Sequence, residues 1–155
     1  MSSINRTQLS GLVLSASALV SIALHEGYRS EAYTPVKGDV ATIGFGTTEN
    51  VKAGDTITVE RALAKLLNDT NKFSGAVKQC VTVPLTQYEY DSYVSLSYNI
   101  GPNNFCKSTL VKKLEAYDYD GACKEILKWD KFKGNPLPGL TKRRQEEYKL
   151  CTNTL

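Results

Sequence analysis

The first third of the chain changes from a helical hydrophobic pattern to a strand-like one. Apolar residues recur at helical spacing over residues 12–24, and a helix is expected to end near Glu26. Beyond it, Gly38-Asp39 marks a turn, and residues 42–46 alternate in the manner of a strand. The pattern predicts two short strands that form a hairpin directly after the helix.

The rest of the chain is predicted to be mostly helical, because apolar residues at helical spacing lie between capping and breaking residues. Thr58 and Ser108 are expected to cap helices, and Thr86 with Glu89 forms a capping box. The predicted helices cover residues 59–80, 86–98, 109–116, 120–130 and 141–151, with a loop at residues 133–139. Helical spacing is expected to pair Lys142, Arg143 and Arg144 with Glu146 and Glu147. These charges are expected to form a solvated face of the last helix, and binding of peptide carboxylates is the alternative.

The composition is typical of a single globular domain. The chain has 155 residues, 41% of them hydrophobic, which is enough to bury a core without a second domain. A net charge of +3 is too small to suggest nucleic acid but would suit an anionic substrate. A single histidine and the absence of C-x-x-C spacing give no reason to expect a metal site. No phosphate-binding or dinucleotide motif implies a cofactor.

Glu26 is the first candidate for chemistry. It follows the apolar residues 19–24 and precedes a glycine, so it is expected at a helix end against apolar neighbours. Loss of solvent favours the protonated form of a carboxyl group, and glycoside cleavage needs such a group as general acid. The hairpin would place Asp39 and Thr42 across from Glu26, where they would activate or position water, as in inverting glycosidases. The alternative is that Glu26 is an ordinary surface residue and that Asp39 only makes the turn.

One protein family carries these residues in the same order. Its active-site pattern is roughly E-G-x(5)-Y-x-D-x(2)-G-x(2)-T-I-G-x-G-H, and this chain matches it at Glu26-Gly27, Tyr33 and Thr42-Ile43-Gly44-Phe45-Gly46. Further similar segments are Pro84-Leu85-Thr86-Gln87-Tyr88, Tyr98-Asn99-Ile100-Gly101, Ser108-Thr109-Leu110 and Arg143-Arg144-Gln145-Glu146. The chain thus resembles the phage-type lysozymes, the endolysin muramidases of glycoside hydrolase family 24, from residue 26 to about 151. The resemblance implies a mostly helical α+β fold with two lobes and a small β-hairpin at the active-site cleft.

The resemblance assigns catalytic roles residue by residue. Glu26 takes the role of general acid, and Thr42 that of the threonine that helps to hold the nucleophilic water. Pro35 occupies the family's aspartate position, and one additional residue precedes Thr42. Asp39 is the nearest carboxylate in this loop and is therefore expected to replace that aspartate. Thr47 stands where the pattern ends in histidine, so a hydrogen bond made by that histidine is either lost or supplied by another group.

Four residues are expected to bind the sugar chain. Tyr33 belongs to the matched motif, and Asn99 lies in a turn that borders the substrate groove in the family. Ser108 and Thr109 are expected to contact sugar hydroxyl groups in the family layout. Helix capping is an alternative role for Asn99 and the favoured role for Ser108.

The activity that the resemblance implies is hydrolysis of the β-1,4 bond between N-acetylmuramic acid and N-acetylglucosamine in peptidoglycan. Its partner would be the glycan strand, the enzyme would be a monomer without cofactor, and its role would be lysis of the bacterial host of a phage. Two alternatives remain open. One is a catalytically weakened protein that binds peptidoglycan, suggested by Pro35 and Thr47. The other is a soluble lysozyme that needs a holin to leave the host cytoplasm.

The N-terminal segment decides between export and a cytoplasmic stage. Residues 9–24 are uncharged and only weakly apolar, and the segment is shorter than the roughly 20 residues that span a bilayer. It resembles the signal-anchor-release (SAR) segment of certain endolysins, which tethers the exported enzyme to the inner membrane, facing the periplasm, and later leaves it. On this interpretation residues 1–24 form the anchor and residues 25–155 the muramidase domain. The alternatives are an amphipathic core helix or a cleaved secretory signal.

The four cysteines, Cys80, Cys106, Cys123 and Cys151, allow three disulfide pairings. The resemblance favours Cys123 with Cys151, on two helices that the family packs together, and leaves Cys80 with Cys106. The alternative is four buried free thiols in a cytosolic protein.

Overall fold

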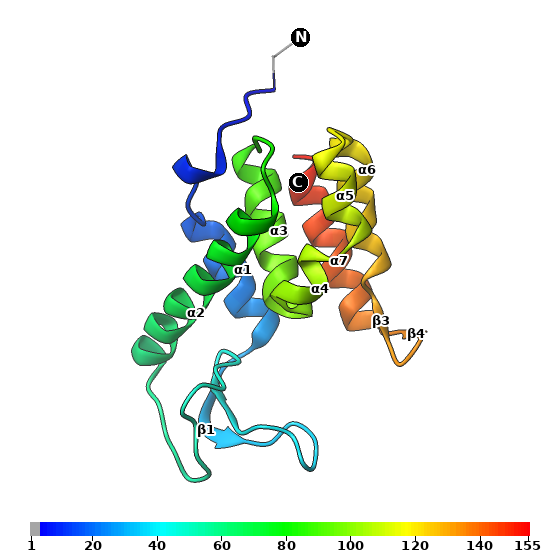
Figure 1. Ribbon diagram of the computed structural model, residues 1–155. Helices are drawn as coiled ribbons and strands as arrows, with labels where there is room; N and C mark the ends of the chain where they lie inside the picture. The colour runs from blue at the N-terminus through cyan, green and yellow to red at the C-terminus, as the bar shows by residue number, and fades with distance from the viewer. Residues whose placement is uncertain (1–3) are drawn as a thin grey trace. The chain divides into compact units, whose positions relative to one another are not determined.

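The structure is a computed structural model that describes residues 4–155. In this part of the chain helices predominate, and two short antiparallel hairpins interrupt them (Figure 1). The α-helices are α1 (Ala16–Glu26), α2 (Val59–Cys80), α3 (Gln87–Ile100), α4 (Pro102–Cys106), α5 (Thr109–Glu115), α6 (Tyr119–Glu125) and α7 (Pro138–Cys151), and the 3-10 turns are η1 (Leu9–Gly11) and η2 (Ile126–Lys128). The strands are β1 (Arg29–Tyr33) paired with β2 (Thr42–Gly44), and β3 (Lys131–Phe132) paired with β4 (Asn135–Pro136). The mostly helical α+β fold class is confirmed.

The chain divides into two compact units. The core unit comprises the described part of Met1–Ala18 together with Phe73–Leu155, and the hairpin unit is Leu19–Lys72. One boundary falls inside α1 and the other inside α2. The predicted N-terminal segment, residues 1–24, is therefore shared between the units, and its residues 1–3 lie outside the described residues.

The core unit contains the main hydrophobic cluster. α3 packs along α7, and α5 packs along α6 (Figure 1). Buried side chains from α3, α4, α5, α6 and the C-terminal end of α2 form one cluster, which the N-terminal Leu9 and Leu12 complete. Burial of each large apolar side chain contributes about 1.5–3 kcal/mol. This cluster is therefore the main source of stability in the unit.

α3 begins at the predicted capping box. The Thr86 hydroxyl accepts a hydrogen bond from the Glu89 backbone N–H (3.0 Å), and the Glu89 carboxylate accepts one from the Thr86 N–H (2.8 Å). The helix ends at Gly101, whose φ of 91° lies outside the range that other residues adopt easily. One turn into α3, Asp91 accepts hydrogen bonds from the Ser15 N–H (3.1 Å) and hydroxyl (2.6 Å).

The N-terminal segment is held at the start of α3 by Arg6. Its guanidinium donates to both carboxylate oxygens of Glu89 at 2.8–3.1 Å and lies 3.5 Å from the centre of the Tyr119 ring. Thr7 and Leu85 exchange backbone hydrogen bonds of 2.8 and 2.9 Å. Because Glu89 is 4% exposed, Arg6 neutralises a carboxylate that the capping box has buried.

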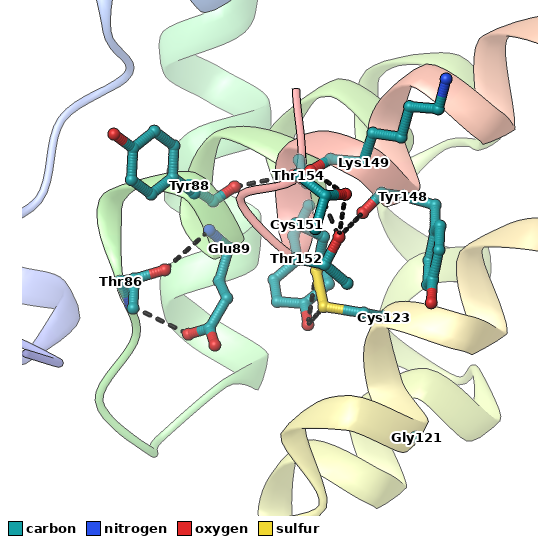
Figure 2. The surroundings of a disulfide bond; sticks show 12 residues. Thr86, Tyr88, Glu89, Gly121, Cys123, Tyr148, Lys149, Cys151, Thr152 and Thr154 are labelled. Atoms are coloured by element: carbon teal, nitrogen blue, oxygen red, sulfur yellow. Dashed lines mark hydrogen bonds between the residues drawn. A yellow bond between two sulfur atoms is a disulfide. The ribbon is translucent and has the colours of Figure 1, made fainter. Parts of the chain in front are cut away.

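Two disulfides cross-link the core unit, in the predicted pairing. Cys80 is bonded to Cys106, and Cys123 of α6 is bonded to Cys151 of α7 (Figure 2). The Tyr93 hydroxyl oxygen lies 3.4 Å from the Cys151 sulfur and 3.8 Å from the Cys123 sulfur. Burial, with the nearby Glu89 carboxylate, raises the pKa of Tyr93 well above its ordinary value, so the hydroxyl stays protonated beside the disulfide.

The N-terminal apolar stretch is less regular than its hydrophobic pattern predicts. η1 occupies its first residues, and α1 begins only at Ala16. α1 does end at Glu26, as predicted. Within residues 4–155, no helix combines the length and apolar composition needed to cross a membrane.

Three predictions for the second half were wrong. The helix predicted at 120–130 ends at Glu125 and continues as η2. The predicted loop at 133–139 contains the turn and second strand of the β3–β4 hairpin, and α7 begins at Pro138 rather than Thr141. Proline suits the first helical position because its missing N–H would have no partner there. α4 was not predicted.

Three of the charges predicted to lie on a solvated face of α7 are buried instead. Arg143, Arg144 and Glu147 are 5%, 0% and 3% exposed. Glu147 lies 2.9 Å from the Arg144 Nε and 3.3 Å from the Arg143 Nε, and it accepts a 2.7 Å hydrogen bond from the Ser95 hydroxyl on α3. The spacing predicted the pairing correctly. The burial arises because α7 packs this face against α3, which helical spacing alone does not reveal.

Candidate active site

Glu26 is the last residue of α1 and is half-buried. The chain leaves the helix through Gly27, whose φ is 71° and whose N–H donates a 3.0 Å hydrogen bond to the Ala23 carbonyl. A glycine at this position adopts the left-handed conformation that ends a helix without steric cost. The predicted placement of Glu26 at a helix end, immediately before a strand, is confirmed.

The β1–β2 hairpin follows Glu26 directly. Tyr33 pairs with Thr42 and Arg29 with Gly44, with an irregularity between these two pairs. β1 has partners on both edges, because its backbone also bonds to the segment Asp55–Ile57 through Ala32 N–H to Asp55 O and Ile57 N–H to Ser30 O, each 2.9 Å. Two-sided bonding fixes the backbone of the strand that carries Tyr33.

Asp39 and Thr42 both bond to Val40. The Asp39 carboxylate accepts a 2.9 Å hydrogen bond from the Val40 N–H, and the Thr42 hydroxyl donates to the Val40 carbonyl at 3.3 Å. Asp39 is exposed, whereas Thr42 is 7% exposed. The turn closes through the Asp39 N–H to Val36 O bond of 2.9 Å, with Gly38 at a φ of 89°. Two of the predicted catalytic side chains are therefore hydrogen-bonded to the backbone of the same residue.

Thr47, which stands where the motif ends in histidine, bonds to a side chain of α2. It is 3% exposed, and its hydroxyl donates a 2.9 Å hydrogen bond to Asp69 on α2. Its backbone exchanges two hydrogen bonds with Ile43, at 2.9 and 3.0 Å. Asp69 was not among the residues predicted from the sequence. The signal in the sequence is its position three residues after Leu66, which places a carboxylate on the apolar side of the predicted helix.

The hairpin is fitted closely to α2. Gly44 has a φ of 64°, and a Cβ at this position would lie 3.0 Å from the Ala62 Cβ. Phe45 packs on Tyr28 with ring centres 5.5 Å apart, and the Tyr28 hydroxyl donates to the Ile57 carbonyl at 2.8 Å. The glycine of the matched motif is thus required for packing as well as for backbone conformation.

The other predicted sugar contacts belong to the core unit. The Asn99 side-chain oxygen accepts a 2.9 Å hydrogen bond from Arg144. Ser108 caps α5, because its hydroxyl accepts from the Val111 N–H (3.3 Å) and donates to the Phe105 carbonyl (2.6 Å). Thr109 is the exposed first residue of α5. The capping alternative is confirmed for Ser108, while Asn99 bonds to an arginine instead.

Known proteins similar to this chain belong to the family that the motif indicates. The sequence matches the family "Phage lysozyme" over residues 23–147. The chain belongs to the phage lysozyme family. This lysozyme is 45% identical over 141 residues to an endolysin of Acyrthosiphon pisum secondary endosymbiont phage 1, covering 88% of this chain and 96% of that one.

A solved structure and a second relative extend the comparison. The endolysin from Escherichia coli O157:H7 phage FAHEc1 superposes with a TM-score of 0.83 at 34% identity, covering 97% of this chain and 98% of that one. A SAR-endolysin of Pseudomonas phage phiKMV is 33% identical over 141 residues, covering 88% of this chain and 86% of that one. This lysozyme is a glycoside hydrolase that acts on peptidoglycan, with the function of an endolysin in host lysis.

Proposed function

We propose that this lysozyme cleaves the β-1,4 bond between N-acetylmuramic acid and N-acetylglucosamine, with Glu26 as the general acid. Asp39 and Thr42 position or activate the attacking water, and the enzyme acts as a monomer on glycan strands. The observation that carries the proposal is the shared bonding of Asp39 and Thr42 to Val40, in the hairpin that directly follows Glu26.

The bonding at Val40 leaves both groups able to bind water. The Thr42 hydroxyl gives its only hydrogen to the Val40 carbonyl, so its lone pairs remain acceptors. An ionised Asp39 carboxylate has about four lone-pair sites, and the Val40 N–H uses one of them. A water that donates to both groups would be oriented for attack while Glu26 protonates the leaving oxygen. Tyr33, Asn99 and Thr109 are proposed to contact the sugar chain.

The test of the catalytic assignment is the lysis rate of Gram-negative cells stripped of their outer membrane. Glu26→Gln removes the transferable proton and is expected to lower the rate at least ~100-fold, as is Asp39→Asn. Thr42→Ala is expected to cost about tenfold, because it deletes one water-binding group. In Asp39→Asn the side-chain amide oxygen would still accept the Val40 N–H, so the turn is retained and only the charge is lost. Asp120→Asn, an exposed change in the core unit, is the matched control.

Product analysis tests the bond. N-acetylmuramic acid at the new reducing ends, seen by mass spectrometry, is the expected result, and N-acetylglucosamine there would refute the proposed bond. A Glu26→Gln variant with the parent's lysis rate would exclude Glu26 as the acid. Protein that binds peptidoglycan but releases no reducing ends would instead support the weakened binding protein.

The proposal includes a stage at the inner membrane. Residues 1–24 would act as a releasable anchor and residues 25–155 as the muramidase domain, exported to the periplasm. The uncharged character of residues 9–24 and the resemblance to a SAR-endolysin support this stage. Retention in the host cytoplasm is the alternative.

Val20 offers a test that separates membrane insertion from folding. It is 56% exposed in the folded protein, so a lysine there costs little in the folded state. In a membrane-inserted helix a central lysine costs roughly 2.5–3.5 kcal/mol. Val20→Lys is expected to shift the uncleaved protein from the membrane fraction to the soluble fraction, whereas Val20→Ser is expected to leave most of it in place. Equal fractionation of the two variants would exclude the anchor.

A further inference from the structure

The β3–β4 hairpin stands apart from the core of its unit. Lys131 pairs with Pro136 and Phe132 with Asn135, and all residues from 131 to 139 are exposed. Lys133 and Gly134 form its two-residue turn with φ values of 50° and 82°. Positive φ at both central positions gives the turn whose twist matches that of the strands.

The hairpin is fixed at its base. The Leu137 N–H donates to the Asp130 carbonyl at 2.9 Å, and the Thr141 hydroxyl donates to the Asp130 carboxylate at 2.9 Å. An isolated two-stranded hairpin is marginally stable, and ordering each residue has an entropic cost. Since this hairpin buries none of its own side chains, its ordered shape contributes little to folding. A contact with a ligand would explain why the shape is maintained.

The hairpin carries an aromatic residue that two lysines, Lys131 and Lys133, flank in the sequence. Phe132 is 56% exposed, and the Lys133 ammonium lies 5.4 Å from the centre of its ring. Residues 131–145 contain no aspartate or glutamate, and the carboxylate of the preceding Asp130 is bonded to Thr141. The surface therefore suits a ligand that combines carboxylates with small apolar groups.

We infer that the β3–β4 hairpin binds the stem peptides of peptidoglycan. Lys131 and Lys133 pair with the free carboxylates of the peptides, and Phe132 packs on their alanine methyl groups. The inference rests on peptidoglycan as the substrate and adds a peptide contact to the proposed sugar contacts. The β3–β4 hairpin of the core unit would then raise the affinity for the substrate. The proposed bond cleavage stays with Glu26, Asp39 and Thr42 in the hairpin unit.

The first measurement is binding to purified sacculi by co-sedimentation, in a Glu26→Gln background that preserves the sacculi. Phe132→Ala and the double change Lys131→Gln with Lys133→Gln are each expected to raise the apparent Kd about 5- to 10-fold. The effect of the lysines is expected to shrink at high salt. Matched controls are Tyr117→Ala, which removes another exposed aromatic, and Lys124→Gln with Lys149→Gln, which removes two other exposed charges. Affinities equal to that of the parent would overturn the inference.

The second measurement distinguishes the possible ligands. On glycan strands stripped of peptides by an amidase, hairpin variants and parent are expected to bind equally. A loss that persists on stripped strands would mean that the hairpin contacts sugar, and a loss seen only on anionic phospholipid vesicles would mean that it contacts membrane. Either result would overturn the inference.

Turnover separates this inference from the proposed catalytic residues. With Glu26 intact, the hairpin variants are expected to raise KM and leave kcat nearly unchanged. If the Glu26→Gln background still released reducing ends, the catalytic assignment would fail. The comparison of KM values would still test the hairpin.

Discussion

The core unit and the hairpin unit are stabilised by different means. The core unit holds the large hydrophobic cluster, both disulfides and the buried ion network around Glu147. The described residues of the hairpin unit include no cysteine, and its loops depend on single hydrogen bonds such as Thr47 to Asp69. The proposed acid and water-binding groups lie in this unit. Substitutions in the core unit should therefore change global stability, and those in the hairpin unit should change local opening and activity.

The largest effect is expected from Glu147→Gln. The change removes the Glu147 carboxylate from the buried Arg143 and Arg144, and breaking a buried ion pair on one side costs about 3–5 kcal/mol. Urea unfolding measures the loss. Lys142→Gln, an exposed charge on the same helix, is expected to unfold like the parent. If Glu147→Gln lowers the free energy of unfolding by less than about 1 kcal/mol, the buried ion network does not stabilise the core unit more than a surface ion pair would.

The two disulfides provide the next comparison. Their sequence separations are 26 and 28 residues, so loop-closure entropy predicts nearly the same stabilisation from each, about 3.5 kcal/mol. One double variant carries Cys80→Ser and Cys106→Ser, and the other carries Cys123→Ser and Cys151→Ser. Urea unfolding measures the free energy of unfolding of each, beside that of the reduced parent. A larger cost at Cys123–Cys151 would show that packing of Tyr93 adds to the entropic effect.

In the hairpin unit, Thr47→Val removes the hydroxyl that bonds Asp69 while keeping a similar shape. Loss of a buried hydrogen bond costs about 1–2 kcal/mol. Hydrogen exchange is expected to accelerate at the Ile43 and Thr47 amides and to stay unchanged in α3. Thr48→Val, at an exposed neighbour, serves as control. Equal acceleration in α3 would show that the two units unfold together.

The smallest effect concerns pH. Burial raises the pKa of Glu125, but hydrogen bonds from Lys128 and Lys113 outweigh it, so the pKa lies below its ordinary value of 4.5. The folded state then binds fewer protons than the unfolded state, and this stabilisation is present above pH 4.5 and is lost as the pH falls through the folded pKa. Glu125→Gln is expected to cost about 1 kcal/mol or less at pH 7 and nothing at low pH. A difference from the parent that is independent of pH would contradict this origin, and Glu60→Gln, at an exposed position, is the control.

Local signals explain what could be predicted of the fold. The Thr86–Glu89 capping box and the Ser108 cap act within three residues, so the sequence alone identifies them. The strands of the β3–β4 hairpin are two residues long, too short for an alternating pattern. The burial of Arg144 was missed because it depends on the packing of α7 against α3.

In the candidate site, too, features set by neighbouring residues could be predicted, and contacts between distant residues could not. The position of Glu26 at the end of α1 could be predicted from the apolar run before it and the glycine after it. The bond between Thr47 and Asp69 joins residues 22 apart, and no local pattern specifies it. The catalytic roles of Glu26, Asp39 and Thr42 stay predictions.

The attachment of the N-terminal segment to α3 has a consequence for the order of synthesis. Arg6 and Glu89 are 83 residues apart, and Ser15 and Asp91 are 76 apart. At about 5–20 residues per second, the ribosome needs on the order of 4–17 s after completing Arg6 before its partner exists. During that time Arg6 and Ser15 have no partner in α3. On the proposed anchor function, a translocon or a lipid surface would bind residues 9–24 first, and the completed α3 would then compete for the residues that precede α1.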